Sequence, residues 1–262
     1  MDIVLTGKKA LVGGSTRGLG KAVAMQLAEC GAEVTLLARN EEKLKAALAD
    51  LPVPAGQKHG FLAADFSDFD SFQRVVSGYF ANRGTDILVN NTHGPAAGGV
   101  TEKSIADYQA AFDTLFKTVV FLTSAALPSM QKNGFGRIIN ISSLSIRQPI
   151  PHLALSNIIR PAVSAWAKSL SSEVARYGIT VNNILTGYFD TERINEIYSG
   201  QALKLGITLE EHKARMARDV PARRFGKPEE YGYLAAFLAS EQAAYITGAN
   251  IPIDGGLTKG NL

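Results

Sequence analysis

The sequence contains very little cysteine and tryptophan, one residue of each in 262 positions. The single cysteine, Cys30, cannot form an internal disulfide and offers no thiolate cluster, so we expect no metal site. We place Cys30 on the buried face of a predicted helix. Stability must therefore come from a hydrophobic core, which a chain of this length can supply.

Long apolar runs and a dominant charge are also missing. No hydrophobic run approaches the roughly 20 residues that a bilayer requires. Residues 1–9 lack the basic and then apolar blocks of a signal peptide, so we expect a cytoplasmic protein with no membrane partner. The 27 basic and 24 acidic residues are interleaved, which gives a formal charge of +3 and no basic stripe. This pattern argues against a nucleic-acid partner.

The remaining composition, 46% hydrophobic and 19% charged, is typical of a globular protein. Short runs rich in Val, Ile and Leu alternate with segments that carry apolar residues at helical spacing, as in 22–28 and 158–174. The alternation predicts βαβ units, and therefore an α/β fold with one doubly wound parallel sheet and helices on both faces. The predicted strands are 10–13, 33–38, 87–90, 137–142, 180–185 and 250–253.

No linker or repeat divides the chain, so we predict a single domain over residues 1–262. Residues 188–224 interrupt the alternation with a polar stretch that contains scattered Ile, Leu, Tyr and Met side chains. An insertion after a late strand of a doubly wound sheet lies over the carboxyl edge of the strands, where ligands bind. The sequence therefore predicts a substrate lid at about 188–224.

Three glycines follow the first predicted strand, spaced four and two residues apart. Such a turn is tight, lets the backbone approach a pyrophosphate, and packs a helix closely against the strand. It lies between the strand pattern of 8–13 and the helical pattern of 21–29, which is the context that a dinucleotide fingerprint needs. The alternative is an ordinary glycine-rich turn. The residues predicted to bind the dinucleotide are Gly14, Ser15, Thr16, Arg17, Gly18, Leu19 and Gly20.

The second predicted strand, 33–38, ends before Arg39, at the place where a carboxylate would bind the 2′-hydroxyl of NAD. A guanidinium suits a 2′-phosphate instead, because charge-assisted hydrogen bonds to phosphate are strong. Arg17, inside the glycine turn, is a second cation for the same phosphate. We therefore predict NADP(H) as the cofactor. The alternative is that both arginines are ordinary surface residues.

In order and spacing, these motifs resemble the short-chain dehydrogenase/reductase family, and the resemblance covers nearly the whole chain. It implies a Rossmann-like NAD(P)(H)-binding fold, a homodimer or homotetramer, and oxidation or reduction of a small alcohol or carbonyl compound. The further matching segments are 64–66, 90–94, 140–143, 186–191, 224–230 and 254–256.

The resemblance also implies roles for residues beyond the glycine turn. Asp65 would accept a hydrogen bond from the adenine amino group, with the backbone of Phe66 nearby; Asp65 is equally suited to cap the helix that follows. Asn91 and Thr92 would line the ribose and nicotinamide side.

Two later positions match the nicotinamide end of the family's cofactor site. Gly187 resembles the residue whose turn allows close approach to the cofactor. Thr191 resembles the residue that binds the nicotinamide carboxamide.

The catalytic residues of the family are matched only in part. The family uses a serine, a tyrosine thirteen residues later, a lysine four residues after that, and an upstream asparagine. Ser143 matches the serine, whereas Ser156, Arg160 and Leu115 occupy the other three positions. Ser143 and Ser156 could donate hydrogen bonds to a developing alkoxide, with Arg160 supplying charge.

Two features leave this site open to other interpretations. Pro161 favours a helix that begins near Asn157, in which case Ser156 is an ordinary N-cap. The motifs also do not identify which side chain would donate the proton in place of the tyrosine. The candidates are His93, His152 and Tyr188.

We predict an NADP(H)-dependent oxidoreductase that transfers a hydride between the cofactor and a small carbonyl or alcohol through an atypical site. The alternative is a catalytically silent NADP(H)-binding sensor or partner subunit with the same fold. Dehalogenase-like chemistry also uses an arginine at the lysine position, but those relatives keep the tyrosine and lose the nucleotide turn.

Overall fold

The computed structural model describes residues 2–260, and its centre is a seven-stranded parallel sheet with strand order β3-β2-β1-β4-β5-β6-β7. The chain winds outward in one direction from β1 to β3 and in the other from β4 to β7. This reversal between β1 and β4 confirms the doubly wound α/β prediction. The strands are β1 (Lys9–Gly13), β2 (Glu33–Ala38), β3 (Gly60–Ala63), β4 (Ile87–Asn90), β5 (Gly136–Ile141), β6 (Ile179–Thr186) and β7 (Asn250–Ile253).

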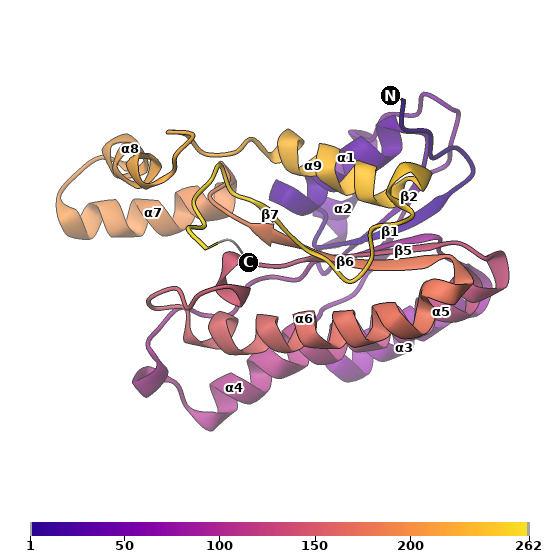
Figure 1. Ribbon diagram of the computed structural model, residues 1–262, viewed down its shortest axis with the longest axis horizontal. Coiled ribbons are helices and arrows are strands. Elements are labelled where there is room, and N and C mark those ends of the chain that lie inside the picture. The colour runs from indigo at the N-terminus through magenta and orange to yellow at the C-terminus, as the bar shows by residue number, and fades with distance from the viewer. Residues whose placement is uncertain (1, 261–262) are drawn as a thin grey trace.

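Helices cover both faces of the sheet, as predicted. In Figure 1, α1, α2 and α9 form the layer above the sheet, and α3, α5 and α6 form the layer below it. The helices are α1 (Gly18–Glu29), α2 (Glu41–Ala49), α3 (Phe69–Asn82), α4 (Ile105–Phe112), α5 (Thr118–Asn133), α6 (Ala154–Val174), α7 (Glu192–Leu205), α8 (Leu209–Asp219) and α9 (Pro228–Ala239).

Successive residues of each central strand point into different cores. Val12 and Ile87 pack under α1 and α9, whereas Leu11 and Leu88 pack against the layer of α3, α5 and α6. Side chains alternate between the two faces of a strand, and both faces are covered, so these strands are continuous apolar runs. Burial of each such side chain contributes about 1.5–3 kcal/mol.

All six predicted strands are present, and no end differs by more than one residue. The short edge strand β3, Gly60–Ala63, was not predicted. The predicted position of Cys30 was wrong, because this residue follows α1 as its C-cap and is only partly buried.

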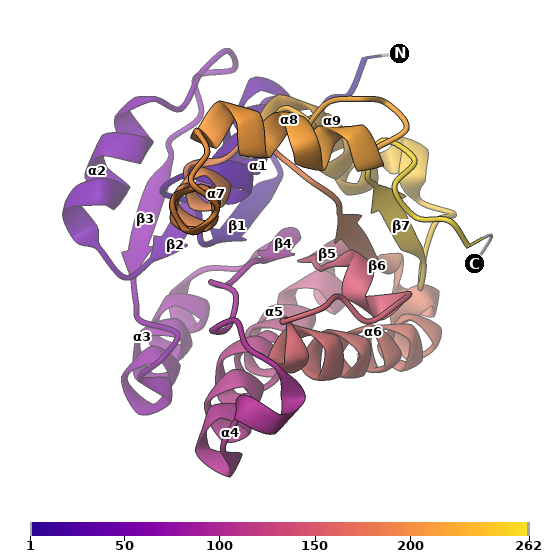
Figure 2. The same ribbon diagram turned by 90° about the vertical axis from the view of Figure 1, so that its left-hand side faces the viewer.

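Residues 188–224 form α7 and α8, which project from the end of the sheet that faces the viewer in Figure 2. The two ends of this segment are paired by backbone hydrogen bonds, from Asp190 N to Gly226 O (2.9 Å) and from Gly226 N to Tyr188 O (2.8 Å). The insertion is therefore a helical hairpin anchored at its base.

One helical run of the described residues, 105–133, is long and apolar enough to span a membrane by length and composition alone. It comprises α4, a π-helical turn at Asp113–Lys117 and α5. In this fold Leu122, Ala126 and Met130 of the run are buried in the core beneath the sheet. A core helix of a globular domain can have the same length and composition, so this run is not evidence of a membrane-spanning segment.

Candidate functional site

The glycine turn connects β1 to α1 beside the switch point of the sheet. Gly14 and Gly18 have positive φ angles of 55° and 56°. A Cβ at Gly20 would lie 2.2 Å from the carbonyl oxygen of Gly14, so only glycine fits there. Asn91 donates from Nδ2 to the carbonyl oxygens of Gly13 (3.1 Å) and Gly14 (3.3 Å). The turn is a bare-backbone cradle of the kind that a pyrophosphate needs.

The remaining residues of the turn divide between structure and surface. Ser15 is fully buried, and its Oγ accepts a hydrogen bond from the backbone N–H of Leu37 (3.1 Å). Leu19 packs against the core above the sheet. Thr16 and Arg17 lie nearer the surface, and Arg17 is the N-cap of α1 without a side-chain capping bond. The first N–H groups of α1 are therefore free of a side-chain cap and open to an anion.

The two arginines predicted for a 2′-phosphate are both exposed. Arg17 forms an ion pair with Glu196 of α7, with Nη1 and Oε1 2.6 Å apart. Arg39 follows β2, and its charge contributes to the lowered pKa of Asp65. A ligand phosphate would reach Arg39 directly, but would have to compete with Glu196 for Arg17.

Asp65 does not cap the following helix. Its Oδ1 accepts from the backbone N–H (2.9 Å) and the hydroxyl (2.7 Å) of Ser67, and these bonds are the main cause of its lowered pKa. Asp68 is the N-cap of α3 and accepts from Ser71 N (3.1 Å). The capping alternative for Asp65 was therefore wrong. Phe66 is buried and packs in the core below the sheet.

Gly187 and Thr191 lie where β6 passes into the lid. A Cβ at Gly187 would come within 2.6 Å of the Cα of Asp254, so this glycine permits close approach of two chain segments. Thr191 is the N-cap of α7 and accepts from Ile194 N. Its methyl carbon lies 3.6 Å from the Cβ position of Gly18. The lid therefore begins directly on the glycine turn.

Ser143 and Ser156 are joined through Ser145. The Oγ of Ser143 accepts from Ser145 N (3.1 Å), which leaves the Ser143 hydroxyl proton free to be donated. Ser156 is buried, and its Oγ lies 3.2 Å from the Oγ of Ser145. Ser143 is partly exposed and keeps its proton free, whereas the buried hydroxyl of Ser156 is turned toward Ser145.

The N-cap interpretation of Ser156 was wrong. Helix α6 begins at Ala154, with Leu153 as its N-cap. The N–H of Ala154, which has no partner inside the helix, donates to the Gly98 carbonyl (3.2 Å), and this contact stabilises the earlier start. Pro161 lies inside the helix. Pro161 has no backbone N–H, so one hydrogen bond of the helix is missing. Buried residues of α6 such as Val163 pack against the cavity and the core and stabilise the helix at this point.

Arg160 lies at the carboxyl end of β5. Its Nη1 donates to the carbonyl oxygen of Ile141 (2.9 Å), and no acidic side chain within residues 2–260 pairs with it. Burial, with a smaller contribution from the Arg193 charge, lowers the pKa of Arg160 to about 10, so the guanidinium remains charged at neutral pH.

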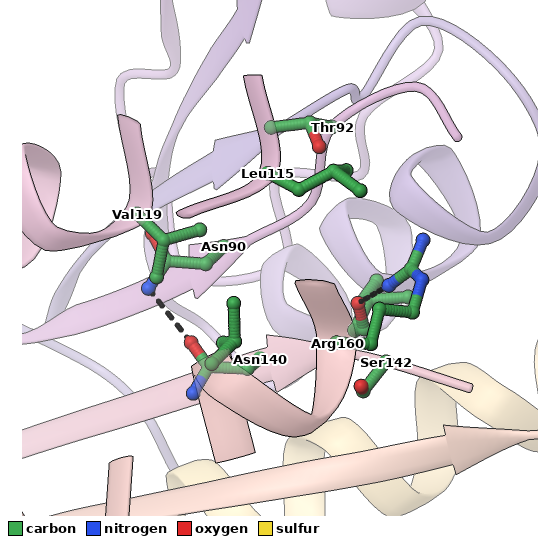
Figure 3. A pocket seen from close by; sticks show the side chains of 9 residues that line it. Asn90, Thr92, Leu115, Val119, Asn140, Ser142 and Arg160 are labelled. Atoms are coloured by element: carbon green, nitrogen blue, oxygen red, sulfur yellow. Dashed lines mark hydrogen bonds between the residues drawn. The ribbon is translucent and has the colours of Figure 1, made fainter. Parts of the chain in front are cut away.

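A small cavity of about 20 Å³ lies beside Arg160 at the carboxyl ends of β4 and β5 (Figure 3). Leu115, the residue at the family's asparagine position, comes from the π-helical turn and points into this space. Such turns often occur at functional sites. The lining residues are Asn90, Thr92, Leu115, Val119, Asn140, Ile141, Ser142, Arg160 and Val163.

None of the three proton-donor candidates lines this cavity. Desolvation, followed by the Arg39 and Arg193 charges, lowers the pKa of His93, which favours the neutral form of its ring. His152 is exposed in a loop with a positive φ of 60°. The ring of Tyr188 packs against that of Phe225, just after the lid, and burial raises its pKa.

Sequence reasoning missed a row of hydrogen-bonded asparagines, of which three are buried and the last is partly buried: Asn90, Asn140, Asn183 and Asn250. One of them occurs in each of four predicted strands whose other residues are mostly apolar. A buried amide needs partners, so this recurrence was a usable signal.

A glycine turn at the switch point of a doubly wound parallel sheet defines an α/β dinucleotide-binding protein of the Rossmann type. The family model described as enoyl-(acyl carrier protein) reductase matches residues 14–258. The chain belongs to the short-chain dehydrogenase/reductase family.

Several relatives match over nearly their full lengths. The 3-oxoacyl-[acyl-carrier-protein] reductase FabG of Chlamydia muridarum is 33% identical, over 98% of this chain and 100% of the relative. The NADPH-dependent reductase BacG of Bacillus subtilis is 31% identical, over 96% and 98%. The crystal structure of L-sorbose reductase from Gluconobacter frateurii, complexed with NADPH and L-sorbose, has a TM-score of 0.93 at 29% identity and covers 99% and 100% of the two chains.

Proposed function

We propose that this protein is an NADP(H)-dependent oxidoreductase that transfers a hydride between the cofactor and a small carbonyl or alcohol substrate. The observation that carries the proposal is the bare-backbone cradle, in which the carbonyl of Gly14 excludes any side chain at Gly20. The family assignment and the NADPH named for two of its relatives support it.

The cofactor residues divide along the length of the nucleotide. The turn from Gly14 to Gly20 holds the pyrophosphate through backbone N–H groups. Arg39, with Arg17 after release from Glu196, binds the 2′-phosphate. Asp65 and the Phe66 backbone hold the adenine. At the nicotinamide end the proposed residues are Asn91, Thr92, Gly187 and Thr191. When bound, the cofactor supplies or accepts the hydride.

The site that stabilises the substrate oxygen is atypical for the family. Ser143 donates its free hydroxyl proton as a hydrogen bond to that oxygen, and Arg160 supplies positive charge. Ser156 stands at the family's tyrosine position but acts only through Ser145, whose N–H fixes the Ser143 oxygen. Arg160 stands at the lysine position and stays protonated, so it contributes charge and does not relay a proton.

One observation favours the second candidate, a catalytically silent NADP(H)-binding protein. The Ser156 hydroxyl is buried against Ser145, and therefore presents no acidic group to a ligand. In that case the nucleotide site is kept and the reaction is lost.

Binding and turnover separate the two candidates. NADPH binding is followed by its fluorescence, and NADPH oxidation by absorbance across ketones, aldehydes, quinones and acyl thioesters. Turnover of any carbonyl class supports the oxidoreductase. NADPH binding without turnover across the panel supports the silent protein, and failure of folded protein to bind NADPH contradicts both.

Replacement of Ser143 tests its role. Ser143→Ala should lower kcat about 10²-fold, because a hydrogen bond made to the charged oxygen is lost, while the NADPH Kd stays within twofold. Ser172→Ala, at an exposed position of α6, is the matched control and should leave kcat unchanged. A large loss of NADPH affinity in Ser143→Ala would instead make Ser143 a structural residue.

We also propose that the protein is cytoplasmic and a homodimer or homotetramer. The apolar helical segments 104–130 and 157–177 are the candidate interface.

A further inference from the structure

The start of α7 contacts the loops on both sides of the switch point of the sheet. The methyl carbon of Thr191, the N-cap of α7, lies 3.6 Å from the Cβ position of Gly18 in the glycine turn. Arg193 donates from Nη2 to the carbonyl oxygen of Gly94 (3.3 Å), in the loop that follows β4. Figure 2 shows α7 end-on over this edge of the sheet. The first turns of the lid therefore reach from the loop after β1 to the loop after β4.

Two carboxylates of α7 lie against the parts of the glycine turn that attract anions. Both oxygens of Glu196 accept from the Arg17 guanidinium, with Nη1–Oε1 and Nη2–Oε2 distances of 2.6 and 3.5 Å. Oε2 of Glu192 lies 3.8 Å from the Cβ position of Gly18, the first residue of α1. Guanidinium groups and helix N-termini are the usual protein partners of phosphate. The lid thus places negative charge beside the groups proposed to bind the phosphates of the nucleotide.

The charges around Glu196 are those that suit a phosphate. The hydrogen bond from Arg17, and then the charges of Arg17, Arg193 and Lys43, lower the pKa of Glu196. Lys43 lies in the first turn of α2, which follows Arg39. One carboxylate is therefore attracted by three cations, which come from the glycine turn, from α2 and from α7 itself. A phosphate monoester carries nearly two negative charges at neutral pH and is attracted more strongly by the same cations.

We infer that Glu196 is an internal substitute for the 2′-phosphate: it ties α7 to Arg17, and NADP(H) must break this pair to bind, whereas NAD(H) need not. We call the Arg17–Glu196 pair the latch. A phosphate bound to a guanidinium in the bidentate manner uses the N–H groups that Glu196 occupies, so the two anions exclude each other. The inference rests on the proposed function, because it takes Arg17 to belong to the 2′-phosphate site.

The latch couples the nucleotide to the lid. The hairpin has packing of its own, since the ring of Tyr198 on α7 contacts that of His212 on α8 (centroids 4.9 Å apart). Its base is fixed by the hydrogen bonds between Asp190 and Gly226 and between Gly226 and Tyr188. Loss of the latch therefore leaves the hairpin folded and removes one of its contacts with the glycine turn. By linkage, NADPH weakens the latch by the same factor by which the latch weakens NADPH binding.

Glu196→Gln tests the latch, because it keeps the shape of the side chain and removes the charge. The side chains of Arg17 and Glu196 are 48% and 60% exposed, so solvent limits the strength of the pair. The Kd of NADPH should fall about three- to fivefold at low ionic strength, and the Kd of NADH should change less than twofold. Calorimetry with both nucleotides measures the two constants. Glu210→Gln removes an exposed carboxylate of α8 in the same hairpin and should change neither constant.

The same substitution in an Arg17→Ala background separates the latch from simple charge repulsion. The latch is already absent there, so Glu196→Gln should change the Kd of NADPH less than twofold. An equal gain in both backgrounds would mean that Glu196 acts only through its charge, and would overturn the inference. An unchanged Kd of NADPH in the single variant, or an equal gain for NADH, would overturn it as well.

The wild-type protein separates failure of the latch from failure of the proposed function. Folded protein that binds NADPH no more tightly than NADH contradicts the proposed 2′-phosphate site, and the latch with it. Protein that prefers NADPH, but whose affinity does not respond to Glu196→Gln, contradicts the latch alone.

Discussion

The carbonyl oxygen of Gly14 leaves no room for any side chain at position 20, so this position requires glycine. Gly20→Ala would place a Cβ 2.2 Å from the Gly14 carbonyl oxygen and 2.7 Å from Asn91 Nδ2, so the turn must open. The unfolding free energy should fall by about 1–3 kcal/mol. NADPH affinity should fall at least tenfold, because the cradle loses its shape. Urea unfolding and NADPH fluorescence titration measure the two effects.

Gly78 provides a matched control for this substitution. It also lies in a helix, α3, but a Cβ there would meet nothing within 4 Å. Gly78→Ala should stabilise the protein by about 0.5–1 kcal/mol and leave NADPH binding unchanged. If the two alanine variants behaved alike, the steric argument for the turn would be wrong.

We expect Arg39 to determine the choice between NADPH and NADH. Arg39→Ala should raise the Kd of NADPH about 10- to 100-fold, because charge-assisted bonds to the 2′-phosphate are lost, and should change the Kd of NADH less than twofold. Calorimetry with both nucleotides measures the difference. Arg74→Ala, an exposed arginine of α3, should change neither.

The same series distinguishes the two arginines. Arg17→Ala should cost less NADPH affinity than Arg39→Ala, because the phosphate must first displace Glu196 from Arg17. Equal losses for NADPH and NADH in either variant would contradict the assignment of a 2′-phosphate site.

At the scale of elements, the start of α9 depends on Glu230. This carboxylate accepts from both terminal nitrogens of Arg224 (2.6 and 2.7 Å) and from Lys227 N (2.7 Å). The Arg224 bonds and then the Lys227 bond lower the pKa of Glu230 to about 2. A lowered pKa in the folded state means that the contribution to stability is present above the unfolded pKa, near 4.5, and disappears as the pH falls toward 2.

Glu230→Gln tests this contribution. At pH 6 the variant should unfold about 2–4 °C below wild type, since the pair is largely exposed and screened by solvent. The difference between the two proteins should shrink between pH 4.5 and 2, as wild-type Glu230 becomes neutral. Scanning calorimetry across this range checks it. If the difference in unfolding temperature grew as the pH fell, the proposed contribution of ionised Glu230 to stability would be wrong.

The same scale shows what the sequence could predict. Strands such as β2 were found because both of their faces are buried and the apolar run is continuous. The four-residue strand β3 lies at the sheet edge and is only partly buried, so its pattern is weak. The start of α6 was misplaced because Pro161 favoured a later start. The contact between Ala154 and Gly98, which starts the helix, joins residues far apart in the chain.

The site shows a similar limit. The residues of the glycine turn are close in the sequence and could be predicted directly, whereas the row of asparagines on β4 to β7 can be found only when the strand order is known. Asn90 and Asn140 are neighbours only because β4 pairs with β5, and Asn250 joins them through β6. The position of Ser156 against Ser145 depends likewise on how α6 meets the turn after β5. Spacing alone could place Ser156 at the tyrosine position but could not show where its hydroxyl points.

At the scale of the whole molecule, the helical layer below the sheet leaves an apolar surface uncovered. Phe112 of α4 and Ile158 of α6 are 39% and 46% exposed. Phe112 stacks on Phe116, whose ring lies 6.3 Å from that of Trp166 on α6. Apolar surface that continues across two helices is typical of a subunit interface.

The proposed assembly should therefore depend on this surface. Wild-type protein should have two or four times the mass of one chain in light scattering. Ile158→Asp should shift it to the mass of one chain, because a charge cannot be buried without a partner. Leu203→Asp, in the lid and 82% exposed, is the control and should keep the wild-type mass. An assembly that survived Ile158→Asp would have to use another face. A wild-type protein with the mass of one chain would contradict the proposed assembly.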